Sequence, residues 1–218
     1  IISFNDSIYI KNFKEYSKII SEKNALLKQG NTEQLKLWNS MLARSALKLM
    51  KQRKNFVDLI NNYLSEVFKG LSGRYELLKL VYQPSLITNN FQESEILLQL
   101  KKILTRELQY GFAVTGPHRD EYHLILDGKK DRDYFSQGEF RITNLSLIMT
   151  INLLLCDRYS FSPVLIFDDL FSELDDEVIK SVFKYFLQLK NQIFITSTSE
   201  PLKSSPGKQF QVVEGQLG

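Results

Sequence analysis

A single cysteine and the lack of any long hydrophobic run restrict what this chain can be. Cys156 has no partner within the chain, so an intrachain disulfide is excluded. No stretch reaches the roughly 20 apolar residues that a transmembrane helix needs, and no secretory signal is visible. These absences favour a cytoplasmic protein without a membrane partner.

Several patterns of catalysis are missing as well. His118 and His123 are the only histidines, and neither belongs to a cluster with metal-ligand spacing. The sequence contains no Ser-His-Asp set and no glycine-rich dinucleotide fingerprint. It also contains no Gly-x-x-x-x-Gly-Lys-Ser/Thr loop, the element that cradles the phosphates in P-loop enzymes. We therefore expect no complete nucleotide site, no tight ATP binding and no hydrolysis from these residues alone.

What the chain does contain is ordinary for a globular protein. It has 218 residues, of which 43% are hydrophobic and 24% are charged, and its formal net charge is +3. This length accommodates one large domain or two small ones, with a substantial buried core.

The most informative stretch is the apolar run 164–167 followed by Asp168 and Asp169. The run is too short for a helix and is typical of a buried central strand in a parallel sheet. Ligands of open α/β sheets bind at the carboxyl ends of such strands. There one acid can hold Mg²⁺ and the next can orient an attacking water. The alternative is that the two acids merely end a strand and cap the next helix.

A second motif, Ser136-Gln137-Gly138, precedes an apolar helix expected over residues 142–155. A serine and a glycine at a helix start offer a hydroxyl, accessible backbone N–H groups and the positive end of the helix dipole, which together suit a phosphate. A further helix and a β-branched strand are expected between residues 176 and 198. The expected fold class is therefore α/β, with a parallel sheet and flanking helices.

In this order the motifs resemble the second half of an ABC-type ATPase head, with a signature and its helix, a Walker B strand and a D-loop. Residues 116–120 (Gly-Pro-His-Arg-Asp), 136–138 and 167–175 (Phe-Asp-Asp-Leu-Phe-Ser-Glu-Leu-Asp) narrow the resemblance to the RecF family of bacterial recombination-repair ATPases. The resemblance covers nearly the whole chain but begins partway along the family's length. We therefore interpret the chain as a C-terminal portion without the P-loop half, and expect ATPase activity only in a full-length dimer.

The resemblance implies a role for each motif residue. Asp169 would be the catalytic, water-orienting base, and Asp168 would hold Mg²⁺. Many ABC-type heads have a longer glutamate at the position of Asp169, so slow hydrolysis is expected. The signature, Ser136, Gln137 and Gly138, would complete in trans the ATP site of a partner subunit when ATP drives homodimer formation. The D-loop and the switch region would comprise Ser172, Glu173, Leu174 and Asp175, and Thr196 and Thr198.

Ahead of these motifs, residues 1–29 and 32–69 have the apolar spacing of two long helices joined by a turn. The resemblance implies a helical arm over residues 1–75 and an ATPase head over residues 76–218. A helix over residues 93–110 and a β-hairpin turning at Asp127-Gly128 are also expected.

The first 70 residues carry twelve basic and six acidic residues. Arg44, Lys48 and Lys51 share one helix face and form a basic stripe that could neutralise the phosphates of double-stranded DNA without reading its sequence. The alternative is an ordinary solvated helix face. The role of residues 116–120 is also open, because they could lie beside the nucleotide or DNA, or could hold the fold through His118 and Arg119 paired with acids.

Three functions compete. The first is a RecF-like ATP-dependent DNA-binding protein that binds duplex DNA near single-strand gaps and, with recombination mediator proteins, helps to load the recombinase. The second is the ATPase subunit of an ABC transporter, against which the basic arm and the D-loop sequence argue. The third is a non-catalytic DNA-binding or scaffold module that keeps the ABC outline. A P-loop encoded upstream would favour an ATPase over the scaffold.

Overall fold

The computed structural model describes residues 7–74, 76–130, 135–198, 207–213 and 216–217. The chain forms two compact units: unit 1 comprises residues 1–63 and 78–131, and unit 2 comprises residues 64–77 and 132–218. This division differs from the expected boundary at residue 75, because residues 78–131 join the first helices instead of the signature and the acids.

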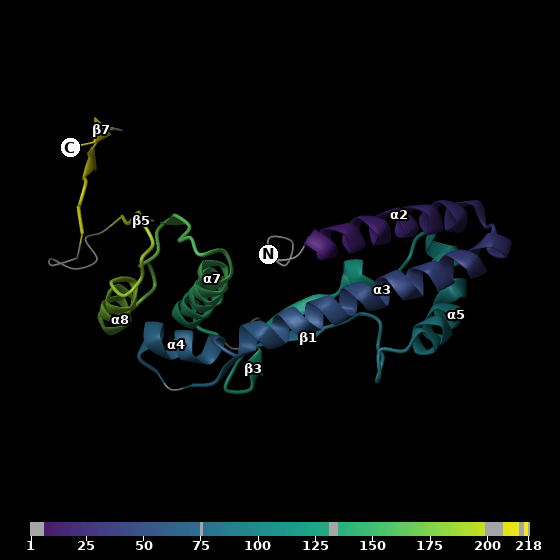
Figure 1. Cartoon of the computed structure of the whole chain (residues 1–218), viewed down its shortest axis with the longest axis horizontal. Helices are drawn as coiled ribbons and strands as arrows, with labels where there is room; N and C mark the ends of the chain where they lie inside the picture. Colours follow the sequence, from purple (N-terminus) through teal and green to yellow (C-terminus); the bar gives the residue numbers. More distant parts are fainter. Residues whose placement is uncertain (1–6, 75, 131–134, 199–206, 214–215, 218) are drawn as a thin grey trace. The chain divides into compact units, whose positions relative to one another are not determined.

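Two antiparallel helices frame unit 1, α2 (Ser7–Gln29) and α3 (Thr32–Asn61), and they lie side by side in Figure 1. Gly30 makes the turn between them with a φ of 65°, a conformation that glycine adopts without strain. Asn31 caps α3 by accepting a hydrogen bond from Gln34 N at 3.5 Å. The pair of long helices predicted from the sequence is thus present, although the second is shorter than expected.

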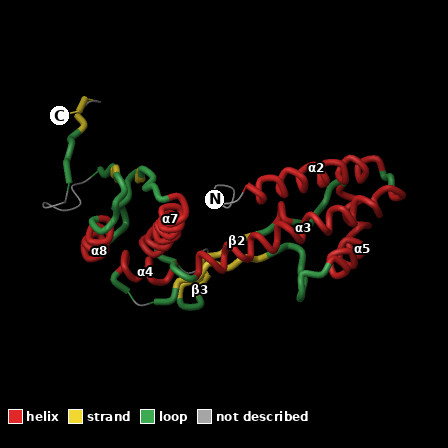
Figure 2. The backbone as a smooth tube through the Cα atoms, viewed as in Figure 1, coloured by secondary structure: helices red, strands yellow, loops and turns green. Residues whose placement is uncertain are grey.

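The core of unit 1 lies between α2, α3 and α5 (Glu93–Tyr110), which coincides with the helix expected over these residues. Its buried side chains are Tyr16, Ile19, Leu42, Ala43, Ala46, Leu49, Met50, Leu86, Ile96 and Leu100. A sheet of β1 (Leu78–Gln83), β2 (Glu121–Leu126) and β3 (Lys129–Lys130) completes the unit, all pairs antiparallel (Figure 2). The hairpin turning at Asp127-Gly128 is confirmed.

The expected helix over residues 32–69 is wrong in one respect, because it is two helices. α3 ends at Asn61, and α4 (Leu64–Ser72) begins after Asn62 and Tyr63 and belongs to unit 2. The side chain of Asn61 explains the break, since its Nδ2 donates to Leu80 O and its Oδ1 accepts from Leu80 N, each at 2.8 Å. The Asn61 side-chain amide thus forms with Leu80 of β1 the pair of hydrogen bonds that the backbone of a neighbouring strand would form.

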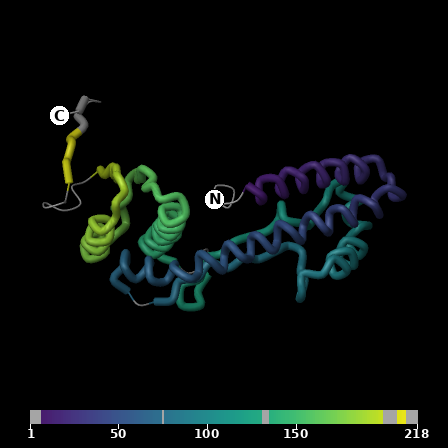
Figure 3. The backbone as a smooth tube through the Cα atoms, viewed as in Figure 1, coloured from purple at the N-terminus to yellow at the C-terminus, as the bar shows by residue number. Residues whose placement is uncertain are grey.

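Unit 2 packs α4 against both α7 (Gln137–Tyr159) and α8 (Asp176–Phe186). Gly70 of α4 permits the contact with α8, because a Cβ there would lie 2.9 Å from the ring of Tyr185. Strands β4 (Leu165–Phe167) and β5 (Ile193–Ile195) pair in parallel, whereas β6 (Val212–Val213) and β7 (Gln216–Leu217) pair with each other. Figure 3 traces the chain through these elements.

The prediction of a buried central strand is wrong for the chain as described. Among the described residues β5 is the only strand paired with β4, and one face of this sheet is open to solvent. Val164 is 54% exposed, Ile166 is 74% exposed and Phe194 on β5 is 51% exposed. The opposite face is covered, because Phe167 stacks on Phe186 of α8 with ring centroids 5.5 Å apart. β4 therefore carries apolar side chains that the described part of this chain leaves exposed.

α7 is the one helix in the described part of the chain whose length and composition would suffice to cross a bilayer. It packs against α4, however, and buries the hydroxyl groups of Thr143, Ser146 and Thr150, each of which donates to a backbone carbonyl of the same helix. The side-chain amides of Asn152 and Asn191 also exchange hydrogen bonds of 2.9 and 3.1 Å. These contacts are those of a core helix in a globular domain.

Candidate nucleotide-binding site

Ser136 caps the first turn of α7 through a reciprocal pair of hydrogen bonds with Glu139. Ser136 Oγ accepts from Glu139 N at 3.1 Å, and Glu139 Oε2 accepts from Ser136 N at 2.9 Å. Because the cap uses the hydroxyl oxygen only as an acceptor, the hydroxyl proton stays available for donation. Ser136 and Gln137 are both exposed. This arrangement suits an anion at the positive end of the helix dipole.

Gly138 brings the start of α7 against the turn that follows β4. A Cβ at Gly138 would lie 2.7 Å from the backbone oxygen of Glu173, which itself has a φ of 65°. No residue larger than glycine fits this approach without a shift of the turn. Close packing within unit 2 therefore explains why a glycine occupies position 138, apart from any contact with a nucleotide.

Replacing Gly138 by alanine should lower the free energy of unfolding by about 1–3 kcal/mol, because the added methyl group must displace the backbone at Glu173. Urea denaturation followed by circular dichroism measures this change. The direction of the change in the free energy of unfolding distinguishes a packed position from an open one, since Gly→Ala at an unobstructed helical position stabilises a protein by up to about 1 kcal/mol. A stabilised Gly138→Ala variant would contradict the close packing described here.

The acids meet the switch residue Thr196 at one edge of the parallel sheet. Asp168 and Asp169 follow β4 directly and Thr196 follows β5, so the parallel pairing brings them together. Thr196 Oγ1 donates to Asp168 Oδ1 and accepts from Asp169 N at 3.0 Å. Thr198, predicted with them, is exposed farther along the chain.

Asp169 occupies an unusual environment for a carboxylate. Its φ of 47° lies in the left-handed region, which aspartate and asparagine tolerate better than other side chains. Arg141 Nη1 donates a hydrogen bond to its carbonyl oxygen. Within the described part of the chain, Asp169 Oδ1 is buried without a hydrogen-bond partner. A buried carboxylate oxygen left in this way is costly, which indicates that a further group completes the site.

The two acids fit Mg²⁺ better than a metal held by the protein alone. The described residues contain no group of three or more His, Cys, Asp or Glu side chains that could hold a metal ion. Mg²⁺, however, is commonly bound through one or two carboxylates together with the phosphates of a nucleotide. The exposed Asp168 and the unpaired Oδ1 of Asp169 supply that number of carboxylates.

The D-loop residues connect the acids to α8. Ser172 Oγ donates to Asp169 O at 3.4 Å, and Asp175 caps α8 by accepting a hydrogen bond from Val178 N at 2.9 Å. The helix cap considered as an alternative role for Asp168 and Asp169 is thus made by Asp175 instead.

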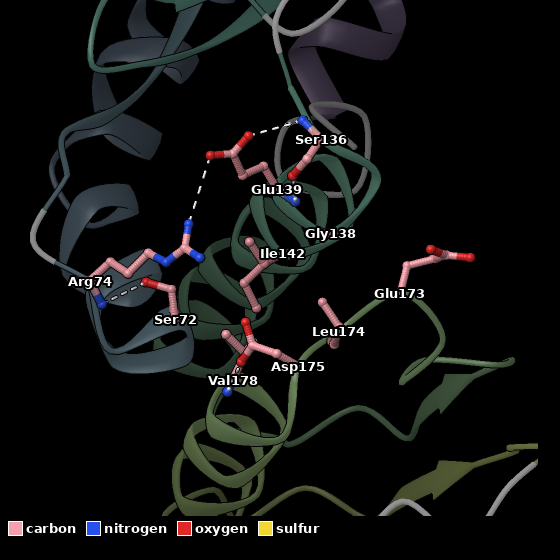
Figure 4. A pocket seen from close by; sticks show the side chains of 10 residues that line it. All are labelled: Ser72, Arg74, Ser136, Gly138, Glu139, Ile142, Glu173, Leu174, Asp175 and Val178. Atoms are coloured by element: carbon pink, nitrogen blue, oxygen red, sulfur yellow. Dashed lines mark hydrogen bonds and ion pairs between the residues drawn. The ribbon is translucent and has the colours of Figure 1, made fainter.

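A pocket of about 170 Å³ lies beside the signature and the D-loop within unit 2. Figure 4 shows Arg74 and Glu139 pointing toward each other across it, with Nη1 and Oε1 3.7 Å apart. The lining residues are Ser72, Arg74, Ser136, Gly138, Glu139, Ile142, Glu173, Leu174, Asp175 and Val178. Arg74 thereby places a cation next to the signature.

Sequence reasoning missed both Arg74 and Arg141. Arg74 reaches the signature only through the packing of α4 on α7, for which the sequence gives no local sign. Arg141 lies in the second turn of α7, where no local sequence pattern marks it as a partner of the acids. Its hydrogen bond to Asp169 O joins α7 to a residue that follows β4, so it depends on tertiary packing.

The basic stripe lies on α3 in unit 1, and two of its members face acids there. Arg44 Nε lies 3.0 and 3.1 Å from the two carboxylate oxygens of Glu93, and Lys48 Nζ lies 3.4 Å from Glu15 Oε2. All three basic side chains are exposed, including Lys51. Exposed ion pairs of this kind contribute only about 0–1 kcal/mol, so a phosphate could replace the acids.

Residues 116–120 hold unit 1 together. The Asp120 side chain is 1% exposed, and its Oδ2 lies 2.6 Å from Arg53 Nη1 and 2.5 Å from the hydroxyl of Tyr82. His118 Nδ1 lies 2.6 Å from the hydroxyl of Tyr16. The structural alternative for this segment is thus supported, but the partners differ from those expected, because Asp120 makes the ion pair and His118 contacts a tyrosine.

The chain matches no family model. It is 30% identical over 219 residues to the DNA replication and repair protein RecF of Trichlorobacter lovleyi, an alignment that covers 98% of this chain and 60% of that protein. It is 32% identical over 219 residues to RecF of Agathobacter rectalis, covering 97% of this chain and 59% of that protein. The chain thus spans about 60% of the length of the curated relatives that it matches.

Solved structures give the same result. A structure described as the recombination mediator protein RecF-ATP in the RecFOR pathway superposes with a TM-score of 0.78 at 27% identity, covering 98% of this chain and 58% of that chain. A second, described as RecF-ATPrS in the same pathway, superposes with a TM-score of 0.75 at 25% identity, covering 97% and 58%. The expected fold class and the resemblance stated from the motifs are confirmed.

Proposed function

Because the chain belongs to the RecF family, we propose that it supplies the signature, the Walker B acids and the DNA-binding arm of an ATP-dependent DNA-binding protein. The full protein would act in the cytoplasm in recombinational repair, at duplex DNA near single-strand gaps. It would dimerise on ATP and work with recombination mediator proteins to load the recombinase.

The observation that carries the proposal is the direct connection of the signature to the acids. Gly138 packs on the backbone of Glu173, and Arg141 donates to the carbonyl oxygen of Asp169. A phosphate bound at Ser136 would therefore press on the same turn that positions Asp169. Such a connection couples nucleotide contact at one half-site to the chemistry at the other.

The acids would divide the chemistry between them. Mg²⁺ held at this edge would neutralise charge on the nucleotide's phosphates. Asp168, oriented by its hydrogen bond from Thr196, would be the principal carboxylate for the ion. Asp169 would accept a hydrogen bond from the attacking water through its unpaired oxygen.

The open face of the β4–β5 sheet supports a further segment that carries the P-loop. Ile166 of β4 and Phe194 of β5 are exposed apolar side chains on adjacent parallel strands, and Val164, just before β4, is exposed as well. An α/β sheet with parallel strands is normally covered on both faces. Residues upstream of Ile1 would cover this face and bring a phosphate-binding loop to the edge that Asp168 and Asp169 occupy.

The arm would bind duplex DNA through the basic stripe. Replacing Arg44, Lys48 and Lys51 together by glutamine in the full-length protein should weaken ATP-dependent duplex binding, because fewer phosphates are neutralised. It should also flatten the dependence of affinity on salt, which has a slope of about 0.9 per phosphate contact in log units. Fluorescence anisotropy with a labelled duplex, across a salt series with and without ATP, measures both quantities.

A matched control changes the same amount of charge elsewhere on unit 1. Lys11, Lys14 and Lys18 are exposed on α2 with similar spacing, and their replacement by glutamine should have a smaller effect. Equal losses in both triple variants would mean that general charge, not the stripe, attracts DNA. Unchanged affinity and slope in the stripe variant would leave it as a solvated helix face.

A further inference from the structure

Arg74 is the one base among the described residues that line the pocket beside the signature. Its Nη1 lies 3.7 Å from Glu139 Oε1, and the two side chains are 45% and 29% exposed. The other charged side chains of the lining are acids, Glu139, Glu173 and Asp175. An anion that approaches Ser136 therefore meets three carboxylates and one guanidinium, so Arg74 decides whether this pocket can accept a phosphate.

The two carboxylate oxygens of Glu139 have different partners. Oε2 accepts the 2.9 Å hydrogen bond from Ser136 N that belongs to the helix cap. Oε1 faces Arg74 at 3.7 Å, which is longer than the roughly 2.7–2.9 Å of a hydrogen bond between charged groups. In unit 1, by contrast, Arg53 Nη1 lies 2.6 Å from Asp120 Oδ2. The guanidinium of Arg74 is therefore held loosely and can exchange Glu139 for another anion.

The end of α4 fixes the backbone from which Arg74 extends. Ser72 Oγ accepts a hydrogen bond from Arg74 N at 3.0 Å and donates one to Phe68 O at 2.8 Å. Gly73, between them, has a φ of 70°, and its N–H donates to Lys69 O at 2.9 Å. α4 in turn packs against α7, the helix that begins in the signature. The side chain of Arg74 can thus change its partner while its backbone stays in place.

Glu139 opposes the anion that the signature would bind. A carboxylate in the first turn of a helix suits the helix dipole, but it repels a phosphate that approaches the N–H groups and the hydroxyl of the same turn. A guanidinium has five N–H donors and pairs with a phosphate through two of them at once. A phosphate at Ser136 would therefore attract Arg74 away from Glu139.

We propose that Arg74 binds the terminal phosphate of the nucleotide held by the partner subunit, and that it exchanges its ion pair with Glu139 for this phosphate when two chains associate. The inference rests on the ATP-dependent dimer proposed above and adds to its site a residue outside the signature. Because ADP lacks the terminal phosphate, Arg74 returns to Glu139 after hydrolysis. The exchange thus makes the stability of the dimer depend on which nucleotide is bound.

The test measures the dimer dissociation constant of the full-length protein by sedimentation equilibrium with Mg²⁺ and either ATP or ADP. With ATP, Arg74→Gln should raise this constant at least about tenfold, because a charge-assisted bond to phosphate is lost at each site. Glu139→Gln should lower it about threefold, because Arg74 no longer has to leave an exposed ion pair. Glutamine at position 139 keeps the oxygen that accepts from Ser136 N, so the helix cap remains. With ADP, neither substitution should change the constant.

The double variant separates contact with the phosphate from neutralisation of Glu139. Arg74→Gln/Glu139→Gln should still dimerise more weakly than the wild type with ATP, because the cation for the phosphate is missing. If Arg74 only neutralised Glu139, the double variant would dimerise as tightly as the wild type, and that result would overturn the proposal. A change in the same direction in both single variants would overturn it too, since an ion pair that is merely structural is lost equally from either side.

A matched control replaces another exposed arginine of unit 2. Arg158 lies near the opposite end of α7 from Ser136, about 33 Å away along the helix axis, and Arg158→Gln should leave the dissociation constant unchanged. Equal weakening in this control would overturn the proposal. Circular dichroism melting shows whether any variant has lost its fold. If Arg74→Gln is unfolded, Glu139→Gln alone decides, and no tightening with ATP overturns the proposal.

Failure of this inference can be told from failure of the proposed function. If the wild type dimerises with ATP and Arg74→Gln dimerises equally well, the proposed function stands and the role of Arg74 is lost. If the wild type itself does not dimerise with ATP, both are overturned.

Discussion

Replacing Asp169 by asparagine in the full-length protein should lower the rate of ATP turnover at least about 100-fold, the usual contribution of a general base. Binding of ATP and ATP-dependent dimerisation should persist, because the signature and Asp168 are unchanged. Asparagine is the most suitable replacement, since it tolerates the φ of 47° at this position and keeps the size of the side chain. Phosphate release under single-turnover conditions measures the effect on chemistry.

Two comparisons make the result specific. Asp168→Asn should instead weaken Mg²⁺-dependent ATP binding, which calorimetry with and without Mg²⁺ measures. The 218-residue chain alone, which contains no P-loop sequence, should show no micromolar ATP binding. Equal turnover by the wild type and Asp169→Asn would remove Asp169 from the chemistry, whatever the effect of Asp168→Asn.

Lys23 and Glu107 form an ion pair in unit 1, with 2.7 Å between Nζ and Oε2 and with both side chains fully buried. Breaking this pair should lower the free energy of unfolding more than any other substitution proposed for the chain. Lys23→Met leaves the Glu107 carboxylate buried without its cation, and Glu107→Gln leaves the Lys23 ammonium buried without its anion. Each should lower the free energy of unfolding by about 3–5 kcal/mol, the usual cost of removing one partner from such a pair. Glutamine keeps an oxygen that can accept from Val114 N, so the Glu107 variant isolates the charge.

The double variant distinguishes charge from packing. Lys23→Met/Glu107→Gln contains no uncompensated charge, so its cost should be well below the sum of the two single costs. Urea denaturation of the four proteins completes this cycle. Strictly additive costs would show that Lys23 and Glu107 do not act as a pair, despite the 2.7 Å between their charged atoms.

Local patterns predicted those parts of the structure that depend on local sequence. Residues 93–110 have helical periodicity followed by Gly111, and α5 has those bounds. The order of signature, helix, acids and final strand predicted a parallel pair of strands with Asp168 and Asp169 at its carboxyl end. A capping hydroxyl at Ser136 also follows from Ser-x-x-Glu, because the capping box depends on residues within one turn.

Features that depend on tertiary packing could not be predicted in this way. The break after Asn61 depends on hydrogen bonds to Leu80, which no helical pattern reveals. The assignment of residues 78–131 to unit 1 follows from pairing of β1 with β2, two segments separated by a helix. The burial of β4 was overestimated, because an apolar sequence shows that a strand favours burial but does not show which segment packs against it.

In the proposed dimer, each composite ATP site combines the acids of one chain with the signature of its partner. Mixing two inactive full-length variants tests it directly: Ser136→Asp, which keeps a helix-capping oxygen but repels phosphate, and Asp169→Asn. If the signature acts in trans, an equimolar mixture should recover about one quarter of the wild-type ATPase rate, because half of the dimers are mixed and each has one intact site. A mixture no more active than the two variants measured separately would contradict a signature that acts in trans.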